Sequence, residues 1–161
     1  MPSEAALQLV EEGKLELDAP VARVWPEFAA NGKESITLRQ LLCHRAGLPA
    51  IRQPLAPEAL YDWTCMTDAL AAEQPWWAPG TDQGYAAMTY GWLVGELLRR
   101  VDGCGAGESI VRRTAAPLGL DFHVGLDDSQ ADRVAYLTRT KNDFGDACAQ
   151  RLLKALMSDP A

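Results

Sequence analysis

The sequence predicts a helix-rich α+β domain. Several segments carry apolar residues at helical spacing, only two or three short stretches favour an extended chain, and 48% of the 161 residues are apolar. That length suits one domain with a core of its own. We find no internal repeat and no linker that would divide the chain, so we predict a single domain over residues 1–161.

Residues 4–13 predict the first helix. Ala6, Leu7 and Val10 share one face at helical spacing, and Gly13 is placed to end the helix in the left-handed conformation. We expect this face to be the buried one.

A short extended stretch and a second helix follow. Residues 14–20 alternate between polar and apolar side chains and end at a proline. Thr37 and Gln40 have the spacing of a capping box, in which each side chain binds the backbone N–H of the other residue. This pattern predicts a helix over residues 38–44 that stops before Gly47.

The middle of the chain predicts two longer helices on either side of a Pro-Gly turn. A proline suits the first turn of a helix over residues 57–73, and residues 74–81 then break the chain. In residues 87–101, Arg99 and Arg100 complement the negative end of the helix dipole. The apolar face of this helix consists of Ala87, Tyr90, Gly91, Val94, Leu97, Leu98 and Val101.

The last part predicts a weaker helix over residues 106–116, one short strand over 122–126 and an amphipathic helix over 143–157. In that last helix the inward residues are Phe144, Cys148, Leu152, Leu153 and Leu156.

Charge and cysteine content exclude several classes of protein. The net charge of −7 and the pI near 4.8 argue against binding to nucleic acid. The sequence has no run of 18 or more apolar residues, the length that a membrane-spanning helix needs, and residues 1–13 lack a signal-peptide pattern. We therefore expect a soluble cytoplasmic chain. The four cysteines form no Cys-x-x-Cys pair and only two histidines accompany them. We therefore expect buried or partly buried reduced thiols, no metal site and no cofactor.

Few general catalytic motifs occur, because the chain has no Gly-x-Ser-x-Gly elbow, no glycine-rich phosphate loop and no His-Glu-x-x-His helix. Six segments nevertheless follow one another in order: ALQLVEEGKL (6–15), ITLRQLLCHRAGLP (36–49), WAPGT (77–81), GYA (84–86), YGWLVGEL (90–97) and APLGL (116–120). Their order and spacing resemble the β-lactamase-related serine hydrolases, a group that includes family VIII carboxylesterases, class C β-lactamases and D-Ala-D-Ala carboxypeptidases. The esterase branch is the most similar.

The resemblance covers residues 4–137 and implies a partial β-lactamase/transpeptidase-like fold, mostly its helical region with a few short strands. It implies a catalytic role for Tyr85, which stands where the family has the phenol that moves protons between the nucleophilic serine and the leaving group. Ala87 replaces the Asn of the β-lactamase loop, which favours an esterase. Trp76 and Trp77 are candidates for lining an acyl pocket, although packing of the turn is the commoner role of such aromatics.

The two histidines are interpreted as structural. His44 lies in a segment similar to the family's His-x-x-Gly-Leu, which we interpret as a helix stop. His123 has no serine or aspartate partner that the sequence makes evident.

The family's nucleophile has no counterpart in these 161 residues. None of the serines is followed three residues later by a lysine, and the nearest pattern, Ser109 with Arg112, offers a group that does not deprotonate. In the family, Ser-x-x-Lys begins the helix whose far end resembles residues 5–15, so we expect the catalytic serine to lie before Met1. The late Lys-Thr-Gly strand also finds no match.

Three interpretations remain open. The chain is a truncated relative of an esterase-like serine hydrolase without turnover of its own, or a non-catalytic protein whose pocket binds an acyl or peptide ligand or a partner chain. Alternatively, its gene model starts too late and the active enzyme begins ~50–100 residues earlier. A small ester or amide is the expected ligand.

Helices that cover a sheet carry apolar faces that need it. We therefore expect Val94, Leu97 and Leu98, or the apolar face of residues 143–157, to risk facing water and the chain to be marginal and prone to self-association, unless the helices re-pack or dimerise.

Overall fold

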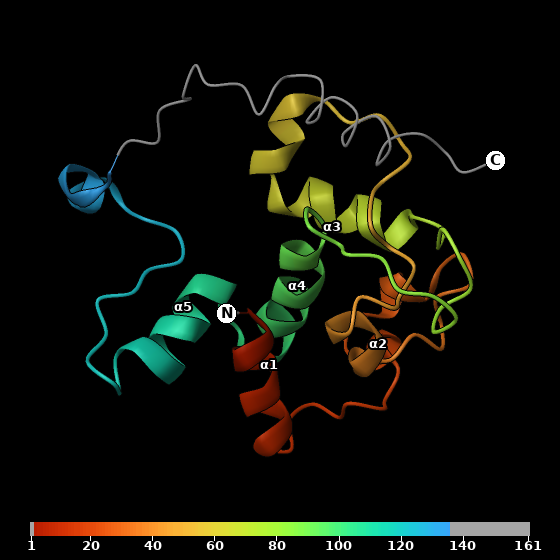
Figure 1. Cartoon of the computed structure of the whole chain (residues 1–161), viewed down its shortest axis with the longest axis horizontal. Coiled ribbons are helices and arrows are strands. Elements are labelled where there is room, and N and C mark those ends of the chain that lie inside the picture. The colour runs from red at the N-terminus through yellow and green to blue at the C-terminus, as the bar shows by residue number, and fades with distance from the viewer. Residues whose placement is uncertain (1, 136–161) are drawn as a thin grey trace. The chain divides into compact units, whose positions relative to one another are not determined.

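The structure, a computed structural model, describes residues 2–135, and most regular structure in that range is helical (Figure 1). The α-helices are α1 (Pro2–Glu11), α2 (Leu38–Leu42), α3 (Trp63–Ala72), α4 (Tyr90–Asp102) and α5 (Ala106–Ile110). Helix α5 continues as a π-helical turn, η4 (Val111–Ala115). The 3-10 turns are η1 (Val21–Arg23), η2 (Pro26–Ala29), η3 (Pro57–Tyr61) and η5 (Asp128–Arg133).

The chain divides into two compact units, Met1–Gly125 and Leu126–Ala161. The first unit holds helices α1 to α5. The described part of the second unit is η5 with its flanks, where the Asp127 side chain caps the turn by accepting a hydrogen bond of 2.8 Å from the Ser129 N–H. The helix predicted over residues 143–157 lies outside the described residues.

Helix α4 is the centre of the first unit and contacts each of the other four α-helices (Figure 1). Its side chains Val94, Leu97 and Leu98 are buried, so the expectation that they risk facing water is wrong. Helices α1, α3 and α5 cover them in place of a sheet. Burial of each such side chain contributes about 2 kcal/mol to the hydrophobic stabilisation of the fold.

Helix α1 buries the predicted face only in part. Ala6 is buried and Val10 packs partly buried against the core, as predicted, but Leu7 is exposed and Ala5 and Leu9 are buried instead. Both faces of this helix carry a leucine, and the contacts with α4 and α5 decide which one is covered. Gly13 follows in the left-handed conformation with φ of 72°, as predicted.

The capping box of α2 is confirmed. The Gln40 N–H donates to Thr37 Oγ1 at 3.2 Å, and the Thr37 N–H donates to Gln40 Oε1 at 3.0 Å. The alternating stretch before it does not become a strand. It contributes only an isolated antiparallel bridge between Pro20 and Thr37, because no second strand continues the pairing there.

Residues 57–73 form two elements rather than the one predicted helix. The backbone of Asp62 is extended, and its side chain caps α3 by accepting a hydrogen bond of 3.0 Å from the Cys65 N–H, so η3 and α3 are separate. The other end of α3 is capped by a distant loop. There Asn31 Nδ2 donates to the Ala72 carbonyl at 2.6 Å, and the buried Lys33 ammonium donates to the Glu73 carbonyl.

Helix α4 begins at Tyr90, three residues after the predicted start, and ends at Gly103 with φ of 73°. The predicted weak helix over 106–116 corresponds to α5 and η4. The predicted strand over 122–126 is not formed: across residues 2–135 the only β pairing is the isolated bridge near α2. The helix-rich prediction is therefore right, and the described residues supply almost no β component.

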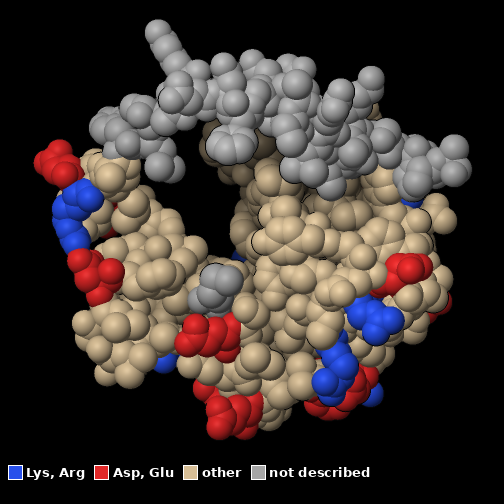
Figure 2. All heavy atoms as spheres, viewed as in Figure 1, with Lys and Arg blue, Asp and Glu red and all other residues tan. Residues whose placement is uncertain are grey.

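Surface charges form pairs of opposite sign. Figure 2 shows acidic and basic side chains close together along the edges of one face. Arg39 binds Asp18 through two hydrogen bonds of 2.7 and 2.8 Å. Exposed pairs of this kind contribute little to stability, because water and salt screen the two charges. Within the described range, no helix is long and apolar enough to cross a membrane.

The cysteine expectation holds only in part. Cys43, Cys65 and Cys104 are free thiols, and the last two are partly buried, but Cys43 is exposed because it lies just after the short helix α2. Cys148 lies outside the described residues. Residues 2–135 contain no group of three or more His, Cys, Asp or Glu side chains that would hold a metal ion.

Candidate active site

Tyr85 lies in a loop that is held against the segment after α2. We call residues 74–87 the Tyr85 loop and residues 43–48 the His44 segment. Three main-chain hydrogen bonds join them, from the N–H groups of Trp76, Gly80 and Gly84 to the carbonyls of Gly47 (2.8 Å), Arg45 (2.8 Å) and His44 (3.1 Å). The Arg45 guanidinium also donates to the Gly80 carbonyl, and Gln83 Nε2 donates to the Cys43 carbonyl at 3.2 Å. Much of the polar backbone of the loop is thus satisfied by one neighbouring segment.

The His44 segment provides these acceptors because its chain turns twice. His44 and Gly47 both adopt left-handed conformations, with φ of 57° and 75°. The interpretation of this segment as a helix stop is confirmed, since α2 ends at Leu42 just before it. The buried Thr89 hydroxyl donates to the Leu48 carbonyl at 2.6 Å, which fixes the start of α4 to the same segment.

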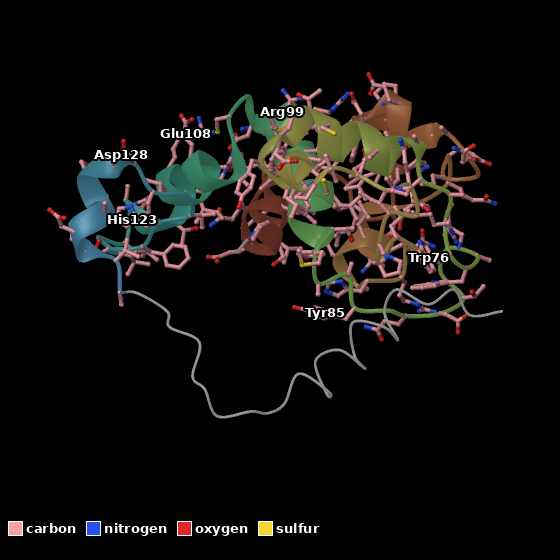
Figure 3. All side chains as sticks on the ribbon, turned by 90° about the horizontal axis from the view of Figure 1, so that it is seen from above. Trp76, Tyr85, Arg99, Glu108, His123 and Asp128 are labelled. Carbon is pink, nitrogen blue, oxygen red and sulfur yellow. The ribbon has the colours of Figure 1, made fainter. Side chains whose placement is uncertain are left out.

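Tyr85 itself points into solvent, with 76% of its surface exposed. Figure 3 shows Tyr85 and Trp76 towards one side of the molecule and Arg99 towards the other. The ring of His44 lies edge-on to Tyr85 at a centroid distance of 5.0 Å. The phenol is therefore accessible to a ligand, while hydrogen bonds hold the backbone of its loop in place.

A row of side chains leads from Tyr85 to the start of α1. The His44 ring also contacts the Tyr90 ring, at a centroid distance of 4.6 Å. Burial raises the pKa of Tyr90, and a hydrogen bond with Ser3 opposes that rise. Ser3 lies in the first turn of α1, so the Tyr85 loop, the first residue of α4 and the beginning of α1 meet in one place.

Trp76 and Trp77 pack within and beside the loop. The Trp76 indole N–H donates to the Ala50 carbonyl at 3.1 Å, and the Arg52 guanidinium lies over its ring at 4.2 Å. The Trp77 indole N–H donates to the Asp82 carbonyl at 3.2 Å, and its ring lies against Gly84. Both indoles are half-buried, and both use their polar atom inside the protein. A role in substrate binding stays a prediction for these two residues.

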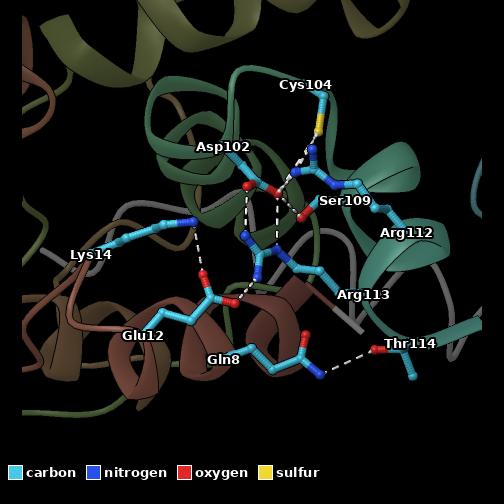
Figure 4. A network of polar contacts seen from close by, with 9 residues as sticks. All are labelled: Gln8, Glu12, Lys14, Asp102, Cys104, Ser109, Arg112, Arg113 and Thr114. Carbon is cyan, nitrogen blue, oxygen red and sulfur yellow. Dashed lines mark hydrogen bonds and ion pairs between the residues drawn. The ribbon is translucent and has the colours of Figure 1, made fainter. Parts of the chain in front are cut away.

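Ser109 and the two lysines of the described range, Lys14 and Lys33, are engaged in other contacts. Ser109 is fully buried, and its hydroxyl donates to Asp102 at 2.7 Å in the polar network of Figure 4. Lys14 pairs with Glu12 at 2.8 Å, and Lys33 binds backbone carbonyls. Ser109 therefore has neither the access nor the lysine partner that a nucleophile of this family needs.

Two side-chain arrangements were missed at the sequence level. His123 does have a partner, since Nε2 lies 3.0 Å from Asp121 Oδ1, but the pair is exposed and lies two residues apart on an irregular segment. The larger omission is the ion-pair network of Asp102 with Arg112 and Arg113. Arg113 also binds Glu12, so this network joins residues more than 90 positions apart in the sequence. Only the charged residue types signal it in the sequence.

Cavities lie elsewhere in the first unit. One of about 220 Å³ is lined by residues of the 13–24 segment with Leu38 and Leu97. A shallower one is lined by Gln8, Glu11, Glu12 and Arg113. Neither includes Tyr85, Trp76 or Trp77.

Gly47 lies where the His44 segment contacts the Tyr85 loop, and the contact leaves no room for a side chain at this position. A Cβ there would lie 2.7 Å from the Trp77 carbonyl oxygen, and its φ is 75°. We expect Gly47→Ala to lower the free energy of unfolding by about 2 kcal/mol or more, because steric conflict adds to left-handed strain. Urea unfolding measures this loss.

Gly13→Ala is the matched control. Its φ is 72° and nothing lies within 4 Å of the added Cβ, so only the strain of about 1 kcal/mol remains. Equal losses in the two variants would mean that the close contact with the Tyr85 loop has no energetic weight.

Comparison with known proteins agrees with the resemblance to the β-lactamase-related serine hydrolases. The family model described as Beta-lactamase matches residues 3–159. The esterase/beta-lactamase LipL of Mycobacterium tuberculosis is 35% identical over 151 residues, which cover 91% of this chain and 35% of LipL. Among solved structures, a penicillin-binding protein homologue from Caulobacter crescentus is 38% identical with a TM-score of 0.84, over 99% of this chain and 44% of that one. A family VIII carboxylesterase is 39% identical with a TM-score of 0.80, over 83% of this chain and 37% of that one.

The chain spans about a third of the length of the curated relatives it matches, with 35% of LipL and 32% of a beta-lactamase of Escherichia coli. The match to the family model over residues 3–159 and the similarity to several solved structures agree in extent. The chain belongs to the β-lactamase family.

Proposed function

We propose that this chain forms the helical, tyrosine-bearing part of an esterase-type serine hydrolase, and that these 161 residues do not turn over substrate on their own. The observation that carries the proposal is the position of Tyr85. The phenol is exposed on a loop whose backbone is bound to the His44 segment, and the rings of His44 and Tyr90 connect it to Ser3 at the beginning of α1.

The chemistry assigned to Tyr85 is proton transfer. In acyl transfer to a serine, the phenolate oxygen accepts the serine proton as the Oγ–C bond forms and returns it to the leaving oxygen as the ester bond breaks. A neighbouring ammonium favours the phenolate. Lys14 and Lys33 are engaged elsewhere, and Ser109 is buried, so the described residues support binding and orientation without covalent catalysis.

An assay of the purified chain tests the second part of the proposal. With p-nitrophenyl butyrate and with nitrocefin, we expect no hydrolysis above that of a Tyr85→Phe variant measured beside it. Turnover that depends on Tyr85 would overturn the claim of inactivity.

A chimera tests the first part. In LipL, the aligned third of the sequence is replaced by the residues of this chain that align with it, which cover 91% of the chain, so that the remaining parts of the hydrolase are supplied by the relative. We expect esterase activity that falls by about 10²-fold or more on Tyr85→Phe, the usual cost of losing a positioned acid–base group. Tyr61→Phe is the control, since Tyr61 is also an exposed tyrosine, in η3. Equal activity of the two variants would refute the role of Tyr85.

A further inference from the structure

We propose that His44 is the positioning residue for Tyr85, holding the peptide groups on both sides of it. The Gly84 N–H donates to the His44 carbonyl at 3.1 Å, and the Ala86 N–H donates to His44 Nδ1 at 3.3 Å. One residue thus accepts from the N–H before Tyr85 and from the N–H after it. The functional meaning of this clamp rests on the function proposed for Tyr85, but its geometry does not.

The ring of His44 fits this task in its neutral form. A peptide N–H is always a donor, so Nδ1 must be the acceptor and the ring proton must sit on Nε2. Partial burial lowers the pKa of His44, which favours the neutral ring at pH 7. Protonation of Nδ1 would place two donors against each other and break the bond to Ala86.

The ring of His44 contacts Tyr85 from the loop and Tyr90 from α4, and Cys43 and Arg45 flank it in its own segment. The Arg45 guanidinium, the charged group next to it in the chain, donates to the Gly80 carbonyl. The clamp is therefore expected to follow the protonation of His44 itself.

The backbone conformation of His44 indicates that its side chain does more than form the turn. Its φ of 57° is left-handed, a conformation in which glycine and asparagine are at less cost than histidine. The hydrogen bond that the His44 ring accepts from the Ala86 N–H explains a strained residue at this point, since the Ala86 side chain is buried.

The same conformation gives two informative variants. His44→Gly relieves the backbone, keeps the carbonyl acceptor and removes Nδ1. His44→Asn also suits the left-handed backbone and carries Oδ1 the same number of bonds from Cα as Nδ1, without a titrating group. His123→Asn is the control, because His123 contacts Asp121.

The experiment is NMR on the full chain, with amide order parameters of Tyr85 and exchange protection of the Ala86 amide, each normalised to an unstructured peptide at the same pH. In the native chain at pH 7 we expect the Tyr85 order parameter at about 0.85, falling below about 0.6 once His44 is protonated. The Ala86 amide should lose about fivefold to tenfold of its protection, the equivalent of one hydrogen bond.

His44→Gly should show the loose values at both pH extremes, His44→Asn the ordered values at both, and His123→Asn the native titration. Unchanged Tyr85 and Ala86 amides in His44→Gly, or on protonation of His44, would refute the clamp, as would a failure of His44→Asn to restore them. These measurements need no turnover. A clamp that behaves as expected, combined with a chimera indifferent to Tyr85→Phe, would therefore leave the clamp standing and remove the proposed function.

Discussion

Asp102→Ala should lower the free energy of unfolding by about 4 kcal/mol, the range for removing one partner of a buried ion pair. The Asp102 side chain is 4% exposed and accepts from Arg113 at 3.0 and 2.6 Å and from Ser109 at 2.7 Å. Hydrogen bonds from Arg113 hold the pKa of Asp102 well below its usual range, against the opposing effect of burial. Without the carboxylate, the Arg113 side chain, itself 10% exposed, keeps only Glu12 as a counter-ion.

Urea unfolding followed by tryptophan fluorescence measures this loss. A second variant separates the buried charge from the lost contact: Asp102→Leu combined with Arg113→Met removes both partners and should recover much of the stability. Asp68→Ala is the control, as an exposed aspartate on α3, and should change stability by no more than about 0.5 kcal/mol. A loss for Asp102→Ala no larger than the control's would show that the network of Figure 4 contributes nothing to holding α1, α4 and α5 together.

Glu96→Gln should cost about 3 kcal/mol at pH 7, because four charge-assisted or indole hydrogen bonds converge on one buried carboxylate. The Glu96 side chain is 1% exposed and accepts from Trp63 Nε1 at 2.7 Å, from Arg99 at 2.8 and 2.7 Å and from Arg100 at 2.7 Å. The bond from Trp63 ties α3 to α4, and the other three lie within α4. They also mean that Arg99 and Arg100 bind a side chain of their own helix in addition to complementing its dipole.

The pH dependence follows from the direction of the shift. Burial alone raises the pKa of Glu96, but the bonds from Arg99, Trp63 and Arg100 outweigh it and lower the pKa from 4.5 to about 2. Because the folded pKa lies below the unfolded one, this stabilisation is complete above pH 4.5 and is lost as the pH falls towards 2.

The difference between the native chain and Glu96→Gln should therefore shrink between pH 7 and pH 3. The exposed Glu108, changed to Gln, should show no difference at either pH. A constant difference for Glu96→Gln across this range would contradict the ionised, buried carboxylate.

The elements that the sequence predicts correctly are those determined by neighbours along the chain. The Thr37 and Gln40 capping box and the left-handed Gly13 depend on residues within one helical turn, and both are confirmed. The buried face of α1 depends instead on where α4 and α5 lie. Leu7 and Leu9 are equally apolar, so periodicity alone does not distinguish the exposed one from the buried one.

The candidate site divides in the same way. Tyr85 was found through the order of segments that resemble a family, whereas the ring contact between His44 and Ala86 joins residues 42 positions apart. Lone histidines usually have structural roles, and the helix stop was indeed confirmed. The hydrogen bond from the Ala86 N–H to the His44 ring exists because the Tyr85 loop packs against the His44 segment, and no local sequence pattern signals that packing. The burial of Val94 and Leu98 also depends on distant elements: the sequence left exposure and re-packing of the helices open, and in the structure α4 packs against α1, α3 and α5.

The contact between α1 and η4 also determines the order in which the chain acquires its structure. Gln8 Nε2 donates to Thr114 Oγ1 at 3.4 Å across 106 residues, and Glu12 binds Arg113 across 101. A ten-residue helix is marginal by itself, and such distant pairs form only after a long loop has closed. During synthesis, α1 leaves the ribosome before η4 and finds its ion-pair partner only when Arg113 has followed. Helix α1 is thus made well before the contact that fixes it in place, which predicts slow folding for so helical a domain.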